Sequence, residues 1–362
     1  PPVDIEGASR PFGAGVDIGA FEWHGPQLFL PLINRTCTAP TVAGWAVGAL
    51  ADGSSSVVMR TEDGGLTWTR QYTAPHDLDG LAVIDAQHAW VTGMNRTVLV
   101  TADGGQTWQP RPLPAFVPAT TRIKVTAASA QTAWIIATVD GAPDGAGYVL
   151  RTRDGGLTWD TQLQAPVGPG GFSWINAADE GHVWAVGGYS AALSAAPRID
   201  PGFIWHTANG QDWSKQAEPA AGIVIGVDAV NANVAWAAGR QGVHRTLDGG
   251  NRWDFYELFI MSDANHIDSV EDGAKVWASG DSFQVYYTDQ GLNPNLTAQD
   301  WQNRTPAVLG NKVAFMVDFI DAQNGWIAGG AFGGSVGGVI AQTCDGGLTW
   351  QHQAWPELGS VE

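Results

Sequence analysis

The sequence predicts an all-β fold: a single seven-bladed β-propeller of four-stranded antiparallel blades, preceded by a short N-terminal arm. Three observations lead to this prediction. A tryptophan-rich motif recurs seven times along the 362 residues. The composition, with 47 Gly and 20 Pro but only 15% charged residues, is that of a chain rich in turns. Apolar and polar residues alternate over short stretches, which is typical of strands, and no stretch keeps a helical period.

The repeated motif is T-x-D-G-G-x-T-W. Its four full copies begin at Thr61, Thr101, Thr152 and Thr343, and its three degenerate copies begin at Thr207, Thr246 and Thr288. The copies recur at about 47 residues, which is the length that one blade needs for four short strands and their turns. Seven copies therefore predict seven blades.

Each unit carries a second pattern ahead of the motif: an apolar stretch, a turn residue and a strand centred on a tryptophan, as in 321–329 (DAQNGWIAG). In chain order, each blade is therefore expected to contain the apolar strand, the Trp-centred strand, the strand that ends at the motif Thr, and the strand after the motif Trp. The tryptophans of the second pattern are Trp45, Trp90, Trp134, Trp184, Trp236, Trp277 and Trp326. With the seven motif tryptophans they make fourteen of the 18 Trp, which we expect to be structural.

Residues 1–26 contain Gly and Pro but no copy of the motif, and we predict that they form an extended arm, with the propeller spanning 27–362. An exposed extended arm can add a strand to another subunit. A homo-oligomer or a fibre built through this arm is therefore one expected form of self-assembly.

The motif residues have a folding role. A short carboxylate in a tight turn accepts bonds from the backbone amides that follow, the Gly pair allows a positive φ, and the Trp packs between neighbouring sheets. We predict this structural role for Asp63, Trp68, Asp103, Trp108, Asp154, Trp159, Asp248, Trp253, Asp345 and Trp350.

The motif resembles the Asp-box, also called the bacterial neuraminidase repeat. The longer unit, with GWAVG at 44–48 and RTEDGGLTW at 60–68, resembles the photosystem II assembly and stability factor family of plants and cyanobacteria. That resemblance implies a seven-bladed propeller that acts without catalysis, holds protein partners and uses a basic patch. Arg60, Arg151 and Arg245 stand just before the motif Thr, but the net charge of −18 favours solvated strand ends over a patch there.

The Asp-box also occurs in sialidases and xyloglucan hydrolases, so it predicts the fold and leaves the function open. The Arg-Ile-Pro signature of sialidases is absent, since the nearest string, at 121–124, lacks the Pro. Tyr256 and Glu257 are adjacent in sequence, so on a strand they point to opposite faces. We predict that the chain is not an enzyme and keep a carbohydrate-active hydrolase, sialidase-like or xyloglucanase-like, as an alternative.

Charge and hydropathy exclude other classes. A net charge of −18 with only four Lys disfavours nucleic acid, which needs clustered cations. No apolar run approaches the roughly 18 residues of a membrane-spanning helix, so we expect no membrane insertion. The eight His show no spacing typical of metal ligands, so no metal and no cofactor are predicted.

The candidate binding residues lie on loops. The links between the second and third strands share one face of the propeller, and the longest is 188–202 in blade 4. Loops held by a rigid scaffold often carry binding residues. Tyr148, Tyr189, Arg198 and Trp205 lie in or beside the long links, where they can stack on a sugar or on a protein side chain.

Cys37 lies near the end of the first unit's innermost strand, and Cys344 lies in the seventh motif. The first and last blades are neighbours in a closed ring, so these cysteines are candidates for a ring-closing disulfide, which implies an oxidising compartment. The Asn-x-Thr strings at Asn34, Asn95, Asn295 and Asn303 are candidate glycosylation sites. Both features favour an exported protein, extracellular or on the cell surface.

The main functional prediction is therefore a non-catalytic extracellular scaffold that recognises a protein or a glycan on its loop-rich face. A second alternative, besides the hydrolase, is an assembly chaperone for a membrane complex. The family resemblance favours this alternative, and the acidity of the chain disfavours it.

Overall fold

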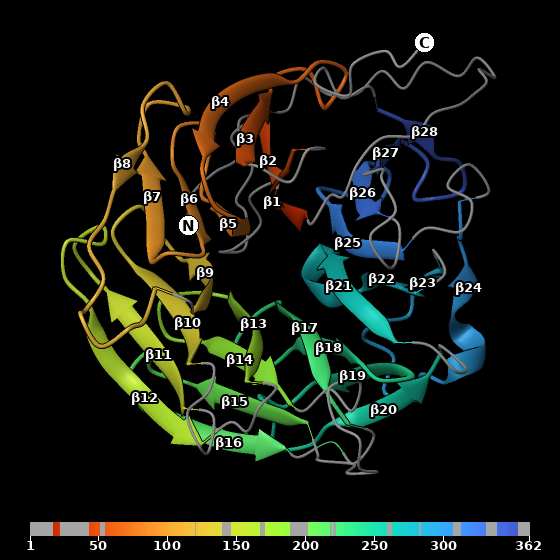
Figure 1. Cartoon of the computed structure of the whole chain (residues 1–362). Coiled ribbons are helices and arrows are strands. Elements are labelled where there is room, and N and C mark those ends of the chain that lie inside the picture. Colours follow the sequence, from red (N-terminus) through yellow and green to blue (C-terminus); the bar gives the residue numbers. More distant parts are fainter. Residues whose placement is uncertain are drawn as a thin grey trace, which may run out of the picture.

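The chain folds into seven four-stranded sheets arranged around one axis (Figure 1). The computed structural model describes residues 17–21, 43–50, 55–119, 121–139, 146–166, 171–188, 202–217, 219, 222–258, 263–281, 284–306, 313–330 and 339–353. The prediction of an all-β, seven-bladed propeller is confirmed. The 3₁₀ helices η2 (Glu271–Gly273) and η4 (Ala298–Asp300) lie among the described residues, which contain no α-helix.

The strands of each blade follow one another from the axis outward. Blade 1 contains β1 (Asp17–Phe21), β2 (Gly44–Ala49), β3 (Ser56–Thr61) and β4 (Thr69–Ala74). Blade 2 contains β5 (Leu78–Val83), β6 (Ala89–Gly93), β7 (Thr97–Thr101) and β8 (Gln109–Pro110). Blade 3 contains β9 (Arg122–Ala127), β10 (Ala133–Val139), β11 (Ala146–Thr152) and β12 (Asp160–Pro166).

The last four blades repeat this order. Blade 4 contains β13 (Phe172–Ala177), β14 (Val183–Gly187), β15 (Phe203–Thr207) and β16 (Trp213–Ala217). Blade 5 contains β17 (Val224–Ala229), β18 (Ala235–Gly239), β19 (Gly242–Thr246) and β20 (Asp254–Glu257). Blade 6 contains β21 (Ala264–Val270), β22 (Lys275–Gly280), β23 (Val285–Thr288) and β24 (Gln302–Asn303). Blade 7 contains β25 (Val313–Phe319), β26 (Gly325–Gly330), β27 (Val339–Thr343) and β28 (Gln351–His352).

Blade 1 differs from the others in its first strand. β1 pairs with β2 in parallel, whereas the other blades are antiparallel throughout. The five residues of β1 lie within the range 1–26 that the sequence assigned to the arm, and the rest of that range lies outside the described residues. β1 also contacts β5 and β25 of the two adjoining blades, so it lies where the ring closes.

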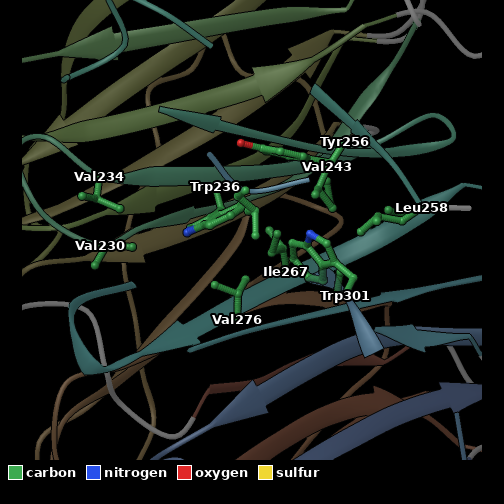
Figure 2. Packing of buried hydrophobic residues seen from close by; sticks show 13 residues of the cluster. Val230, Val234, Trp236, Val243, Tyr256, Leu258, Ile267, Val276 and Trp301 are labelled. Atoms are coloured by element: carbon green, nitrogen blue, oxygen red, sulfur yellow. The ribbon is translucent and has the colours of Figure 1, made fainter. Parts of the chain in front are cut away.

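The hydrophobic core lies between the blades. The described residues form seven apolar clusters, and each cluster joins residues of two adjacent blades. Figure 2 shows the cluster between blades 5 and 6, where Trp236 and Tyr256 of one blade pack near Ile267 and Trp301 of the next. The seven tryptophans of the second strands are all buried, with at most 1% of their surface exposed. Each sheet is therefore stabilised mainly by its neighbours.

Candidate functional site

The two faces of the propeller are built differently. In an antiparallel blade, the turns after the first and third strands emerge on one face, and the links after the second and fourth strands emerge on the other. The Asp-box turns follow the third strands, so they share the first of these faces, which we call the box face. The opposite face, which we call the loop face, carries the long links.

The box carboxylates are engaged in their own turns. In blade 1, Asp63 accepts the backbone N–H of Thr67 at 2.8 Å and the Thr67 hydroxyl at 2.6 Å. The Thr61 hydroxyl donates to Asp63 and accepts the N–H of Gly65, which has a φ of 95°. Equivalent bonds form at Asp103, Asp154 and Asp345.

These bonds favour the ionised carboxylates. Hydrogen bonds from Thr158 lower the pKa of Asp154 to about 2. The pKa values of Asp63, Asp103 and Asp345 are also lowered, because the hydrogen bonds from Thr residues outweigh desolvation, which acts in the opposite direction. A carboxylate with several bound donors and a low pKa is a poor general acid near neutral pH. The geometry therefore supports a structural role for the box.

The first glycine of every box links its blade to the one before it. Its carbonyl accepts a hydrogen bond from a side chain of the preceding blade, and we call this contact the blade latch. In chain order, the acceptors and donors are Gly64 with Trp326, Gly104 with Arg60, Gly155 with Arg111, Gly210 with Arg151 and Gln162, Gly249 with Gln216, Gly291 with Arg245, and Gly346 with Trp277. The latch thus runs round the whole ring, and the Trp326 indole closes it at 3.1 Å.

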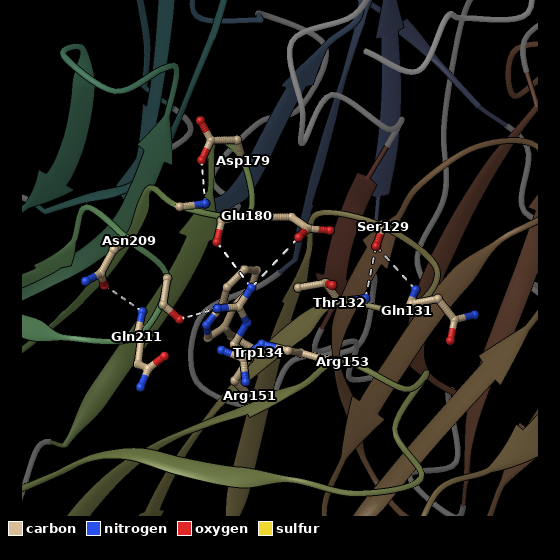
Figure 3. Close-up of polar contacts among 12 residues, drawn as sticks. Ser129, Gln131, Thr132, Trp134, Arg151, Arg153, Asp179, Glu180, Asn209 and Gln211 are labelled. Carbon is tan, nitrogen blue, oxygen red and sulfur yellow. Dashed lines mark hydrogen bonds and ion pairs between the residues drawn. The ribbon is translucent and has the colours of Figure 1, made fainter.

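Three of these donors are the arginines that precede the motif Thr. Arg151 and Arg245 are buried, with 5% and 1% of their surface exposed, and Arg60 is half-buried. Each guanidinium also lies over the second-strand tryptophan of its own blade, at 4.6 to 5.6 Å from the ring centroid. Figure 3 shows Arg151 beside Trp134, with dashed lines to the neighbouring blade.

The expectation of solvated strand ends for these arginines is therefore wrong. A guanidinium directly before the motif Thr lies against the next blade and donates a hydrogen bond to a carbonyl of the box turn there. The basic patch implied by the family resemblance does not form at these three positions, because the guanidinium N–H groups donate to the neighbouring blade and are not presented to solvent.

The inner strands are joined by a second set of contacts near the axis. The Lys124 ammonium donates to the Asp79 carbonyl at 2.6 Å and lies 4.9 Å from the Trp174 ring centroid. Trp174 in turn lies edge-on to His266, with ring centroids 5.1 Å apart. Burial lowers the pKa of His266 to about 4, so this imidazole is neutral near pH 7. Burial raises the pKa of Asp228 to about 7, although Ser269 donates to its carboxylate.

The predicted binding residues fall in different surroundings. Tyr148 is half-buried at the loop-face end of β11 and contacts the ring of Phe116, 5.2 Å away. Trp205 is half-buried and packs against the cluster shared by blades 3 and 4, a core position. Tyr189 and Arg198 lie outside the described residues. Of the two that the structure describes, Tyr148 lies beside an exposed group, Phe116, and Trp205 packs against the core.

Phe116 is a further candidate binding residue, which loop length did not predict. Phe116 is 48% exposed and lies in the link from β8 to β9, which was not among the long links considered. An aromatic residue within the proline-rich string 110–118 (PRPLPAFVP) was the available signal.

The remaining candidates are placed as follows. Asn95, Asn295 and Asn303 are exposed, and Asn34 lies outside the described residues. Cys344 is not a free thiol, but Cys37 lies outside the described residues, so the predicted pairing of the two is not described. Within the described ranges, no group of three or more His, Cys, Asp or Glu side chains is placed to hold a metal. In the same ranges, no helix has the length and apolar character needed to span a bilayer.

The fold and the box geometry define a seven-bladed β-propeller of the Asp-box type. The family described as photosynthesis system II assembly factor YCF48 matches residues 73–187, from the end of β4 to the end of β14. The resemblance to the photosystem II assembly factor family, predicted from the motif, is thereby confirmed.

Individual relatives agree with this match. The chloroplastic photosystem II stability/assembly factor HCF136 of Oryza sativa subsp. japonica is 24% identical over 310 residues, which cover 74% of this chain and 68% of the relative. The photosystem II assembly protein Ycf48 of Thermosynechococcus vestitus is 24% identical over 276 residues, which cover 75% and 70%. The solved structure described as YCF48 bound to D1 peptide has a TM-score of 0.56 at 21% identity, covering 79% of this chain and 83% of that one. At this identity the structural likeness shows the fold alone.

These comparisons overturn part of the sequence analysis. The similar proteins are photosystem II assembly factors, and one of them is named as chloroplastic, so the predicted extracellular scaffold and the predicted export of a secreted glycoprotein are wrong. The solved relative is described with a peptide ligand, which contradicts the predicted glycan ligand and fibre. The Asn-x-Thr strings and the acidic surface led to wrong predictions, because neither feature specifies a compartment or a ligand class. The similar proteins are named as assembly factors and not as enzymes.

Proposed function

We propose that the chain is a non-enzymatic assembly factor that holds a polypeptide segment of a membrane-complex subunit on its loop face. This function was the second alternative predicted from the sequence. The names of the similar proteins, which are assembly factors of photosystem II, support it.

One structural observation carries the proposal: the polar groups of the repeat are used to hold the ring together. In all seven blades the first box glycine accepts a bond from the preceding blade, and four box carboxylates are bound by the threonines of their own turns. Such a ring is a rigid scaffold, and a rigid scaffold positions its loops for binding. Because three arginines contribute to the ring and not to the surface, they do not offset the acidic net charge there, and that charge still counts against this function.

The test is photo-cross-linking in membranes of the source organism. A cross-linking amino acid replaces Asp77 or Glu257, which are exposed at the loop-face ends of blades 1 and 5, or Leu157 or Leu348, which are exposed on the box face. We expect one membrane-protein partner to be captured from the loop-face positions and not from the box-face positions. Capture from the box face alone, or glycan turnover by the purified chain, would contradict the proposal.

A further inference from the structure

We infer that the loop face carries a docking shelf, formed by Phe116, Tyr148, Arg96 and Gln164, for an extended peptide that bears an apolar side chain and a carboxylate a few residues apart. The inference rests on the proposed function and names the surface and the chemistry of the segment bound. The shelf lies where the link from β8 to β9 of blade 2 meets the rim of blade 3.

An aromatic ring is held at the surface of this shelf. Phe116 is 48% exposed, and its ring is tilted by 47° against Tyr148 at a centroid distance of 5.2 Å. The Gln164 amide donates to the Tyr148 hydroxyl at 3.4 Å, and that hydroxyl keeps its own O–H for another partner. One side of the aromatic pair is therefore open, with hydrogen-bonding groups beside it.

The link that carries Phe116 is anchored on both sides of the ring. Leu113 and Val117 are buried, with 7% and 1% of their surface exposed. The N–H of Val117 donates to the Pro114 carbonyl at 3.1 Å, and the N–H of Asn95 donates to the Ala119 carbonyl at 2.8 Å. The exposure of Phe116 thus belongs to a fixed loop, and a fixed aromatic loses little conformational freedom when it binds a partner.

The turn that braces the link adopts an unfavourable backbone conformation. Asn95 and Arg96 have φ values of 56° and 60°, in the left-handed region that non-glycine residues rarely occupy. Asn tolerates this region, whereas Arg does so at a cost. The conformation places the Arg96 guanidinium under the link, where it donates to the carbonyls of Leu113 and Pro114. Both φ values are those of a two-residue hairpin turn between β6 and β7, closed by the Thr97 N–H, which donates to the Met94 carbonyl at 3.2 Å, so the hairpin holds Arg96 in this position.

The charge of Arg96 indicates what the shelf binds. Its Nη2 serves both carbonyls, and among the described residues no carboxylate is paired with it. The remaining N–H groups of the guanidinium are not among the buried unsatisfied atoms, so solvent or a ligand can reach them. In a chain with a net charge of −18, an arginine without a carboxylate partner is complementary to an acidic group on a ligand.

Together these groups fit a peptide better than a sugar. The tilted aromatic pair can pack against an apolar or aromatic side chain, the Arg96 guanidinium can donate to a carboxylate, and the Gln164 amide beside Tyr148 can hydrogen-bond to the peptide backbone. A sugar ring would need a flat aromatic platform surrounded by several hydrogen-bonding groups, whereas this shelf offers a tilted pair and one amide.

The test is selection of 12-residue peptides displayed on phage against the whole chain, followed by fluorescence anisotropy with the selected peptides. We expect a shared pattern of an apolar residue and an Asp or Glu within about three positions of it. The Phe116→Ala variant should weaken binding about tenfold, a typical loss for an interface anchor. Changing the peptide Asp to Asn, or Arg96 to Gln, should weaken binding to a similar extent, and Arg96→Lys should restore part of it.

The controls separate binding from folding. Leu157→Ala removes an apolar side chain that is 60% exposed on the box face and should leave binding unchanged. Because Arg96→Gln can loosen the link, Tyr148→Phe, which keeps the ring and removes only the hydroxyl, serves as a milder variant of the same shelf. Peptides that bind equally well to Phe116→Ala, or that lack an acidic residue, would overturn the inference and leave the proposed function standing. Failure of every peptide to bind, together with failure of the membrane cross-linking, would count against the proposed function itself.

Discussion

Replacing Arg245 by Met tests the blade latch at its most buried point. The Arg245 guanidinium donates to the carbonyls of Gly291 and Asn293 at 2.9 and 2.7 Å, and it lies over the rings of Trp236 and Tyr256. Only 1% of the residue is exposed. Methionine keeps most of the contact with the two rings but has no donor, so the variant removes the latch between blades 5 and 6 together with the 3.7 Å ion pair between Arg245 and the Asp254 carboxylate.

The size of the effect follows from two opposing contributions. Hydrogen bonds to a charged group contribute about 1.5–3 kcal/mol each, and two are lost, leaving two carbonyls without their donor. Removing a buried charge also removes its desolvation cost, which offsets part of that loss. We therefore expect the free energy of unfolding to fall by about 2–4 kcal/mol.

Arg252→Met is the matched control. Arg252 pairs with the same Asp254 carboxylate at 2.6 Å, but its side chain is 78% exposed, and exposed ion pairs contribute at most about 1 kcal/mol. Equilibrium unfolding in guanidinium chloride, with hydrogen exchange at the blade 5 and 6 boundary, measures both variants. A loss below about 1 kcal/mol for Arg245→Met, or equal losses for the two variants, would refute the reasoning.

Three further predictions follow from the structure. First, hydrogen bonds lower the pKa of Asp154 to about 2 in the folded chain, so the stability that this carboxylate contributes is present above its ordinary pKa of 3.8 and is lost as the pH falls towards 2. Asp154→Asn should therefore flatten the acid unfolding curve between these two pH values. An unchanged curve would contradict the role of the carboxylate. Second, burial lowers the pKa of His244 from 6.5 to about 4, so this residue should cost the folded chain up to about 3 kcal/mol of stability as the pH falls from 6.5 towards 4. His206 and His266, whose pKa values are also lowered to about 4, should add to the loss, so His244→Leu should reduce the difference in stability between pH 7 and pH 4.5 without removing it. An undiminished difference would show that His244 does not contribute. Third, Trp326→Phe removes the indole N–H that donates to the Gly64 carbonyl and should lower the free energy of unfolding by about 1–2 kcal/mol more than Trp45→Phe does. The Trp45 indole is a matched control because it is equally buried but has no hydrogen-bond acceptor. Thermal unfolding compares the two variants, and equal losses would show that the ring-closing hydrogen bond contributes nothing.

The repeat allowed much of the fold to be predicted, because it determines local geometry. The box combines Thr, Asp and two Gly in one turn, and each of these preferences acts within five residues. The burial of the second-strand tryptophans likewise followed from their position in every unit. Blade number and strand order could therefore be predicted from seven copies of the unit.

The candidate site was predicted less well. Tyr148 was named from the length of its link, but its partner Phe116 comes from the preceding blade and lies 32 positions earlier in the chain. Arg96 was not considered, because no sequence pattern shows that its guanidinium lies under a link 17 residues ahead. Trp205 was predicted to stack on a ligand, but the structure places its side chain against a core cluster.

By itself, the sequence determined the class of fold, the number of blades and the tight turn of each box, since these depend on preferences that act over a few residues. Tertiary structure alone decided which side chain reaches which neighbouring blade. The three arginines occupy identical positions in their own units, and only the next blade, about 45 to 60 residues away, supplies the carbonyl that keeps each of them out of solvent. The same reason applies to the docking shelf, whose aromatic pair and guanidinium meet only where two blades adjoin.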